Sequence, residues 1–185
     1  MVGGITGSEG MRLFIAINFD EETKKNILSV QGHLKEKGRG RFTSPQNLHL
    51  TLAFLGDVDE GDVPKVMAAM DEVNVPALGL SFDRIGCFRR DEELWWIGLK
   101  ETPELMRLQR DLIASLRAAG LRPDVKPFRP HITLARDMHV GQVDPQELLQ
   151  VPFSTTADNI SLMRSNYPAR KIEYTEIYSV RALQR

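Results

Sequence analysis

The 185-residue chain has a single cysteine, which excludes an intramolecular disulfide and is typical of proteins from a reducing compartment. It has no run that approaches the roughly 18 consecutive apolar residues of a membrane-spanning helix. Its 24 basic and 25 acidic residues give a formal net charge of −1, so it lacks the positive excess of many nucleic-acid-binding proteins. We therefore expect a cytoplasmic protein without a membrane partner, in which any contact with RNA depends on a local basic patch.

The first ten residues differ in character from the rest. Residues 1–10 are rich in glycine and lack the basic and apolar regions of a signal peptide, so we expect a disordered leader or tag remnant. With 42% hydrophobic residues, the chain is long enough to bury a sizeable core. We expect residues 11–185 to form one two-lobed domain, with lobes of roughly 11–90 and 91–185 that can exchange terminal strands.

Two short segments in opposite halves of the chain repeat nearly the same sequence. Residues 49–53 read His-Leu-Thr-Leu-Ala and residues 131–135 read His-Ile-Thr-Leu-Ala, so four of the five positions are identical. Because side chains alternate between the two faces of a strand, each segment is predicted to be a strand with an aliphatic face toward a core. The other face carries His and Thr, which core packing does not require. Their repetition therefore indicates a function.

The repeated residue types suit acid–base chemistry on a phosphate ester. Histidine has an unperturbed pKa of ~6.5, so of two histidines one can accept a proton while the other donates one. His49 and His131 are the candidates for this pair, and the hydroxyls of Thr51 and Thr133 can donate hydrogen bonds to non-bridging phosphate oxygens. Arg136, which follows the second motif, can add a charged contact to phosphate.

Other uses of these residues fit less well. A zinc site needs three or four closely spaced ligands, whereas the chain has four His, one Cys and no Asp or Glu inside either motif. A serine nucleophile lacks its G-x-S-x-G motif, and Cys87 has no histidine near it in the sequence. Metal-dependent hydrolysis is therefore a minor alternative. A non-catalytic module that binds RNA ends or nucleotides is the main alternative to an enzyme.

The hydrophobic patterning predicts an α+β fold. Both halves follow the order strand-helix-strand-helix-strand, and one further strand closes the chain. The expected strands lie at about 13–17, 49–53, 78–85, 94–99, 131–135, 153–162 and 171–180, and the expected helices at about 20–37, 62–73, 102–119 and 144–147. We expect a duplicated two-lobed fold, with two antiparallel sheets around a central groove and helices on the outer faces.

Four segments resemble those of one known family. Residues 11–17 resemble its first strand, and residues 47–56 and 128–136 resemble its two H-x-T-x motifs, including the Phe-Leu-Gly ending of the first and the Arg of the second. Residues 160–165 resemble a late strand and turn, although Arg164 stands where the family commonly has an acidic residue. The chain thereby resembles the 2H phosphoesterase superfamily, and within it the RNA 2′,3′-cyclic phosphodiesterases, historically called 2′-5′ RNA ligases.

This resemblance implies a metal-independent hydrolase without a cofactor. Its substrate is RNA or a nucleotide that ends in a 2′,3′-cyclic phosphate, and its product carries a 2′-phosphate. The reverse reaction joins a 5′-hydroxyl to the cyclic end as a 2′-5′ bond. By analogy with the superfamily, His131 is the proton acceptor that activates water, and His49 is the proton donor to the departing 3′ oxygen. Thr51 and Thr133 hold the non-bridging oxygens.

Several further residues are expected to bind the substrate or to shape its groove. Arg41 and Phe42, in an expected loop before the first motif, can contact a phosphate and stack on a base. Lys126 and Arg129 flank the second motif and can form a patch that follows RNA. One ring of the Trp95-Trp96 pair is expected in the core and the other can line the groove, while Phe54 is expected in the core. We expect a monomer.

Overall fold

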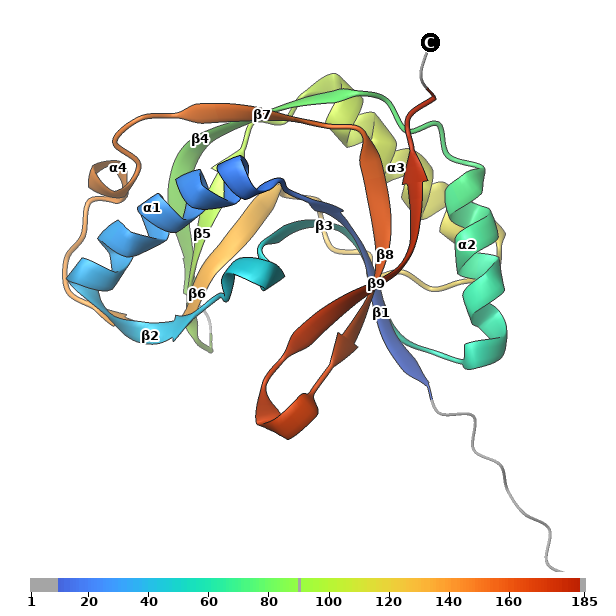
Figure 1. Ribbon diagram of the computed structural model, residues 1–185, viewed down its shortest axis with the longest axis horizontal. Coiled ribbons are helices and arrows are strands. Elements are labelled where there is room, and N and C mark those ends of the chain that lie inside the picture. The colour runs from blue at the N-terminus through green and yellow to red at the C-terminus, as the bar shows by residue number, and fades with distance from the viewer. Residues whose placement is uncertain (1–9, 90, 184–185) are drawn as a thin grey trace, which may run out of the picture.

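The computed structural model describes residues 10–89 and 91–183, and it confirms the predicted α+β class with two antiparallel sheets (Figure 1). In spatial order, the four-stranded sheet contains β3 (His49–Val58), β1 (Met11–Asn18), β8 (Asn159–Asn166) and β9 (Glu173–Arg181). The five-stranded sheet contains β2 (Gly38–Phe42), β6 (His131–Val140), β5 (Glu93–Leu99), β4 (Leu78–Arg89) and β7 (Phe153–Ala157). One motif strand thus lies in each sheet.

In the described part of the chain, four α-helices pack against the sheets. They are α1 (Glu21–Lys37), α2 (Val63–Asp71), α3 (Pro103–Ala118) and α4 (Pro145–Leu148). In the five-stranded sheet α1 contacts β2, β6 and β7 and α4 contacts β4; in the four-stranded sheet α2 contacts β9 and α3 contacts β3. The two long helices α1 and α3 begin after residues whose side chains cap backbone N–H groups, since Asp20 accepts from Thr23 and Thr102 accepts from Leu105. One continuous apolar core contains buried residues from both sheets.

Two glutamine side chains connect the helices to the motif strands. Gln31 of α1 is buried, and its Nε2 donates to the backbone carbonyls of Thr43, at 2.9 Å, and Leu134, at 3.0 Å. Gln109 of α3 donates to the carbonyl of Leu52 at 3.2 Å. Leu52 and Leu134 each stand three residues after a motif histidine, so the same bond recurs in both halves. Each helix thus holds the motif strand that comes from the other half of the chain.

Two sequence-based expectations about strands are wrong. Arg41 and Phe42 do not lie in a loop but end β2, which pairs with β6. The sequence of β2 has no apolar alternation, so its conformation depends on hydrogen bonds to a strand far away in the sequence. Residues 153–162 do not form one strand either, because the chain leaves the five-stranded sheet after Ala157 and enters the four-stranded sheet at Asn159.

The sheets do not divide the chain into halves. The four-stranded sheet takes β1 and β3 from the N-terminal part and β8 and β9 from the C-terminal part, and β2 and β4 cross to the five-stranded sheet. The two lobes of residues 11–90 and 91–185 remain a prediction about domain organisation. Their bounds do not coincide with the two sheets. The expectation for residues 1–10 falls on residues 1–9, which lie outside the described residues, and on Gly10, which is exposed.

Candidate active site

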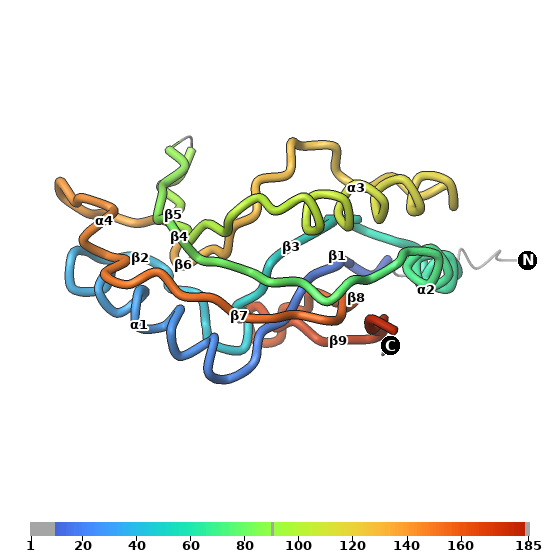
Figure 2. Tube along the Cα trace, turned by 90° about the horizontal axis from the view of Figure 1, so that it is seen from above, coloured from blue at the N-terminus to red at the C-terminus, as the bar shows by residue number. Residues whose placement is uncertain are grey.

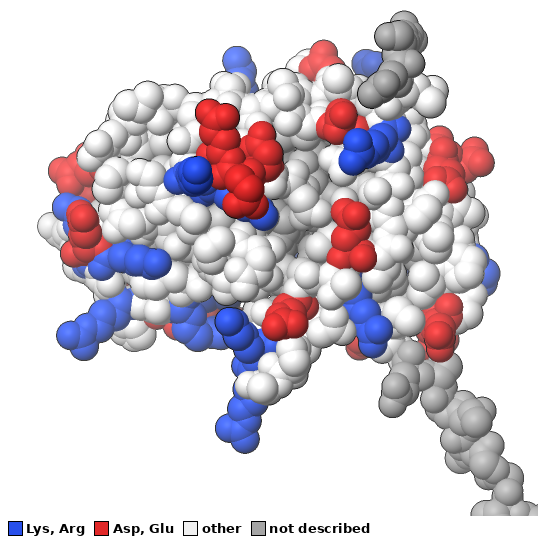
Figure 3. Space-filling model, in the orientation of Figure 1, with Lys and Arg blue, Asp and Glu red and all other residues white. Residues whose placement is uncertain are grey.

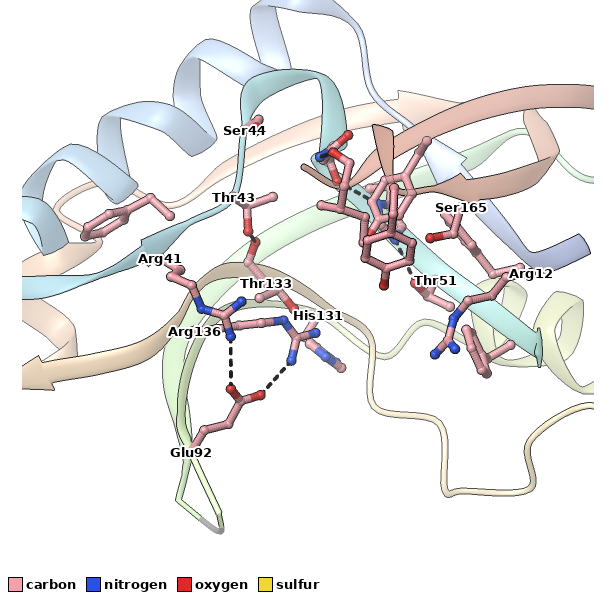
Figure 4. Close-up of a pocket in the computed structure, with 18 of the residues that line it drawn as sticks. Arg12, Arg41, Thr43, Ser44, Thr51, Glu92, His131, Thr133, Arg136 and Ser165 are labelled. Carbon is pink, nitrogen blue, oxygen red and sulfur yellow. Dashed lines mark hydrogen bonds and ion pairs between the residues drawn. The ribbon is translucent and has the colours of Figure 1, made fainter. Parts of the chain in front are cut away.

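The two motif strands bring His49, Thr51, His131 and Thr133 to the wall of one cavity of about 650 Å³. Figure 4 shows Thr51 on the opposite side of this cavity from His131 and Thr133. In each motif the histidine is the first residue of its strand, and its Thr follows two positions later on the same face. The structure therefore brings together all four residues of the repeated motif, as the sequence predicted.

The two histidine rings are held by equivalent hydrogen bonds to backbone carbonyls. The Nδ1 atom of His49 lies 2.7 Å from the carbonyl oxygen of Asn47, and that of His131 lies 2.6 Å from the carbonyl oxygen of Arg129. A carbonyl only accepts, so Nδ1 carries the proton in each ring and Nε2 is the atom with a free lone pair. The Nε2 atom of His49 lies 2.9 Å from Oγ1 of Thr51 and accepts a hydrogen bond from that hydroxyl.

The surroundings of His49 are apolar. Its ring centroid lies 4.8 Å from that of Phe14 and 5.1 Å from that of Tyr174, which meets it edge-on. Phe14 belongs to a small apolar cluster with Ala16 and Met163, separate from the main core. Burial in these surroundings lowers the pKa of His49 from 6.5 to about 4; the Asn47 carbonyl opposes this shift and the charge of His131 adds to it. His49 is therefore neutral at pH 7 in the free protein.

His131 lies against a different pair of rings. Phe88 meets it edge-on at 5.4 Å between centroids, and Trp96 lies at 6.1 Å. Burial lowers the pKa of His131 as well, the Arg129 carbonyl opposes this shift, and the nearby charge of Arg136 lowers the pKa further. Both histidines thus favour the neutral form, in which Nε2 can accept a proton.

Within residues 10–89 and 91–183, four arginines line the cavity, although the whole chain is slightly acidic. They are Arg12, Arg41, Arg136 and Arg170, and among the described residues Glu92 is the acidic side chain that lines the same cavity. On the face drawn in Figure 3, basic side chains protrude along the lower edge, where Figure 1 places β2 and the β8–β9 hairpin. The cavity is therefore a local basic site on a chain that has no positive excess overall.

Glu92 holds two of these arginines. Its carboxylate lies 3.0 Å from Nη1 of Arg136 and 3.6 Å from Nη2 of Arg41, as the dashed lines in Figure 4 mark. Arg41 also pairs with Asp137, with Nε and Oδ2 2.5 Å apart. These groups are partly exposed to solvent, so the pairs contribute little to stability. Their effect is to place two guanidinium groups at the edge of the cavity.

The structure places some of the predicted substrate-binding residues in the cavity and others outside it. Arg41, Phe42 and Arg136 line it. Lys126 does not line it; the side chain is exposed and its Nζ lies 3.4 Å from Asp124. The side chain of Arg129 does not line it either, but the residue contributes its backbone carbonyl to His131.

Phe54 is only partly buried rather than in the core, because its ring lines the cavity with the Arg12 guanidinium 5.2 Å from its centroid. The prediction for the tryptophan pair is right in part. Trp95 is fully buried, but Trp96, whose ring lies near that of His131, does not line the cavity.

Sequence reasoning missed several cavity residues. Arg12, Asn47, Ser165 and Tyr174 all line the cavity. Within the described part of the chain, Oδ1 of Asn47 and Oγ of Ser165 are buried without a hydrogen-bond partner, which marks both as candidate contacts for a polar ligand. One signal was available for Arg12, because it stands two residues before Phe14 on the same face of β1.

Among residues 10–89 and 91–183, no group of three or more His, Cys, Asp or Glu side chains is placed to hold a metal ion. In the same part of the chain, no helix is long and apolar enough to cross a membrane.

Comparison with known proteins identifies the family. Residues 17–96 and residues 97–172 each match the family described as LigT like Phosphoesterase. The chain belongs to this family. The family pattern therefore occurs once in each half of this LigT-like phosphoesterase, in keeping with the repeated motif and with the resemblance inferred from the residues.

Two similar proteins are RNA 2′,3′-cyclic phosphodiesterases. The chain is 33% identical over 128 residues to an RNA 2′,3′-cyclic phosphodiesterase of Archaeoglobus fulgidus, covering 68% of this chain and 72% of that protein. It is 29% identical over 171 residues to an RNA 2′,3′-cyclic phosphodiesterase of Escherichia coli, covering 92% and 96%.

Solved structures of similar proteins have the same fold. The crystal structure of E. coli LigT in apo form superposes with a TM-score of 0.81 at 28% identity, covering 96% of this chain and 100% of that one. The E. coli protein has also been crystallised with 3′-AMP and with phosphate. The TT0787 protein of Thermus thermophilus superposes with a TM-score of 0.77 at 26% identity, covering 92% and 97%.

Proposed function

We propose that this protein hydrolyses the 2′,3′-cyclic phosphate at the end of an RNA or nucleotide. The observation that carries this proposal is the pair of histidines in one cavity, each with Nδ1 bonded to a backbone carbonyl, which makes Nε2 the atom for proton transfer. Four arginines around the pair suit an anionic substrate. The names of the relatives from A. fulgidus and E. coli support the same substrate class.

In the proposed reaction the cyclic phosphate lies between the two Nε2 atoms. His131 accepts a proton from water as the water oxygen attacks phosphorus. The bond between phosphorus and the 3′ oxygen breaks, that oxygen takes a proton from Nε2 of His49, and the phosphate stays on the 2′ oxygen. Thr51 and Thr133 donate hydrogen bonds to the non-bridging oxygens, where negative charge increases in the transition state. Protons exchanged with solvent then restore both rings.

The protonation state of His49 suits its role as proton donor only when substrate is bound. His49 must be protonated to act as the donor, yet burial holds its pKa at about 4 in the free protein. A bound phosphodiester places a negative charge beside the ring, and an opposite charge within a few ångströms favours the protonated form. The substrate itself therefore raises the pKa of His49 and prepares the proton donor.

The proposal includes two finer statements. The product is a 2′-phosphate, because the oxygen that faces the proton donor is the 3′ oxygen. The same groups can also act in reverse, with a 5′-hydroxyl in place of water, and then form a 2′-5′ bond. Both statements follow from the proposed positions of donor and acceptor, since proton transfer at the same two atoms is reversible.

A nucleotide-binding module without catalysis is the second candidate, because LigT of E. coli has been crystallised with 3′-AMP and with ATP. The deciding experiment incubates the protein with adenosine 2′,3′-cyclic phosphate in EDTA. We expect turnover by the wild type and a loss of about 10²-fold or more in His49→Ala and in His131→Ala. His139→Ala, which removes an exposed imidazole from β6, is the matched control. Binding without turnover would favour the module, and activity lost only in EDTA would favour a metal-dependent enzyme.

A further inference from the structure

A second cavity adjoins the active site at the tip of the β4–β5 hairpin. It measures about 590 Å³ and is lined by Phe88, Asp91, Glu92, Leu94, Lys126 and Asp137. Figure 2 shows that this hairpin and the segment between α3 and β6 project from the same side of the molecule. Glu92 lines both cavities, so a ligand that extends past Glu92 leaves the first and enters the second.

The aromatic part of this cavity is supported by a second ring. Phe88 leans on Trp96, with ring centroids 5.2 Å apart and an angle of 38° between the planes. Trp96 in turn lies flat across Gly86 and Gly98, since a β-carbon at either glycine would collide with its ring. Phe88 also meets the edge of His131. The chain therefore builds a supported aromatic surface that begins beside His131 and lines the second cavity and not the first.

The remaining lining combines an apolar side chain with carboxylates. Leu94 pairs with Phe88 across the hairpin and extends the apolar floor. Glu92 and Asp137 are engaged with arginines, but Asp91 has no hydrogen-bond or ion-pair partner among the described residues. Acidic side chains at the rim disfavour a phosphate. They accept hydrogen bonds from the amino and imino groups of a nucleobase, whose ring stacks on aromatic side chains.

We propose that this second cavity binds the base of the penultimate nucleotide, which precedes the terminal nucleotide with its cyclic phosphate. The inference rests on the proposed function and sharpens it, because it makes an RNA end, rather than a mononucleotide, the preferred substrate. The terminal nucleoside with its cyclic phosphate occupies the first cavity, and the preceding base stacks on Phe88. Lys126, which the sequence assigned to substrate binding, lies at this second cavity instead of the first.

The test compares three substrates: adenosine 2′,3′-cyclic phosphate, a dinucleotide with the same cyclic end, and that dinucleotide with an abasic 5′ residue. Stacking of one base on an aromatic side chain predicts that kcat/KM for the dinucleotide exceeds that for the mononucleotide roughly 5- to 100-fold. The abasic dinucleotide keeps the extra phosphate but lacks the base that would stack on Phe88. It should therefore react no better than the mononucleotide.

Two variants locate the effect. Phe88→Ala removes the stacking surface. Because Phe88 also contacts His131, the variant can change the rate with either substrate, so the readout is the ratio of kcat/KM for the dinucleotide to kcat/KM for the mononucleotide. This ratio should fall to about one. Leu94→Ala, which removes apolar atoms from the floor of the same cavity, should lower the same ratio severalfold. Val151→Ala, an exposed apolar side chain elsewhere, should keep the wild-type ratio.

The outcomes separate this inference from the proposed function. Failure of the wild type to turn over any cyclic substrate would overturn the proposed function. Turnover of all three substrates at the same kcat/KM would leave the function standing and overturn the second site. A preference that the abasic dinucleotide retains would assign the gain to the phosphate and also overturn it.

Discussion

The buried state of His49 makes a quantitative prediction about stability at acid pH. Its pKa is about 4 in the folded protein, against 6.5 for an exposed imidazole. Above about pH 6.5 the ring is neutral in both the folded and the unfolded chain and makes no contribution. Between these two values the unfolded chain binds a proton that the folded protein does not, so acidification favours unfolding.

The size of the effect follows from the two pKa values. One pKa unit corresponds to about 1.4 kcal/mol, so the full difference costs about 3 kcal/mol of folding free energy below pH 4 and about 2 kcal/mol at pH 5. His49→Gln removes the titrating group. Between pH 7 and pH 5, the wild type should therefore lose about 2 kcal/mol more of its free energy of unfolding than this variant, measured by urea denaturation.

Two controls accompany this measurement. His139→Gln removes an exposed imidazole from β6 and should lose as much stability as the wild type over the same interval. Titration of the imidazole resonances by NMR should assign the lowest histidine pKa to His49. The reasoning would be refuted if His49→Gln and the wild type lost equal stability, or if His49 titrated near 6.5.

Three further predictions concern the reaction. Thr51→Val removes the hydroxyl beside His49 and should lower kcat for the cyclic phosphate by about 10²- to 10³-fold with the fold unchanged; a loss below tenfold would contradict a role at the non-bridging oxygens. Glu92→Gln removes the carboxylate that competes with phosphate for Arg136, so the inhibition constant of inorganic phosphate should fall by about threefold, and a rise would mean that Glu92 orients the arginine instead. A substrate with sulfur at the 3′ position loses its leaving group without a proton, so it should restore activity to His49→Ala but not to His131→Ala; the opposite pattern would exchange the two roles.

The parts of the site that the sequence predicts are those with a repeated local signal. His49 and His131 stand in matched strands, and their Thr partners recur at the same spacing, so the motif residues and the α+β class follow from the pattern. Strand alternation also indicates which face each histidine occupies. These inferences need only neighbouring residues.

The residues that sequence reasoning missed depend on contacts between distant segments. Tyr174 meets His49 because β9 pairs with β8, which pairs with β1. Glu92 reaches Arg41 because β2, which has no strand pattern of its own, is hydrogen-bonded to β6. The apolar surroundings that lower the pKa of His49 likewise come from three strands of one sheet. No local pattern predicts such pairings, because the sequence around each residue fits several registers.

The roles of His49 and His131 determine which bond of the cyclic phosphate breaks. The measurement is the identity of the product formed from adenosine 2′,3′-cyclic phosphate in EDTA, resolved by ³¹P NMR against authentic standards. With His131 as proton acceptor and His49 as proton donor to the 3′ oxygen, the account predicts adenosine 2′-phosphate alone. Adenosine 3′-phosphate as the product, or unreacted substrate, would contradict it.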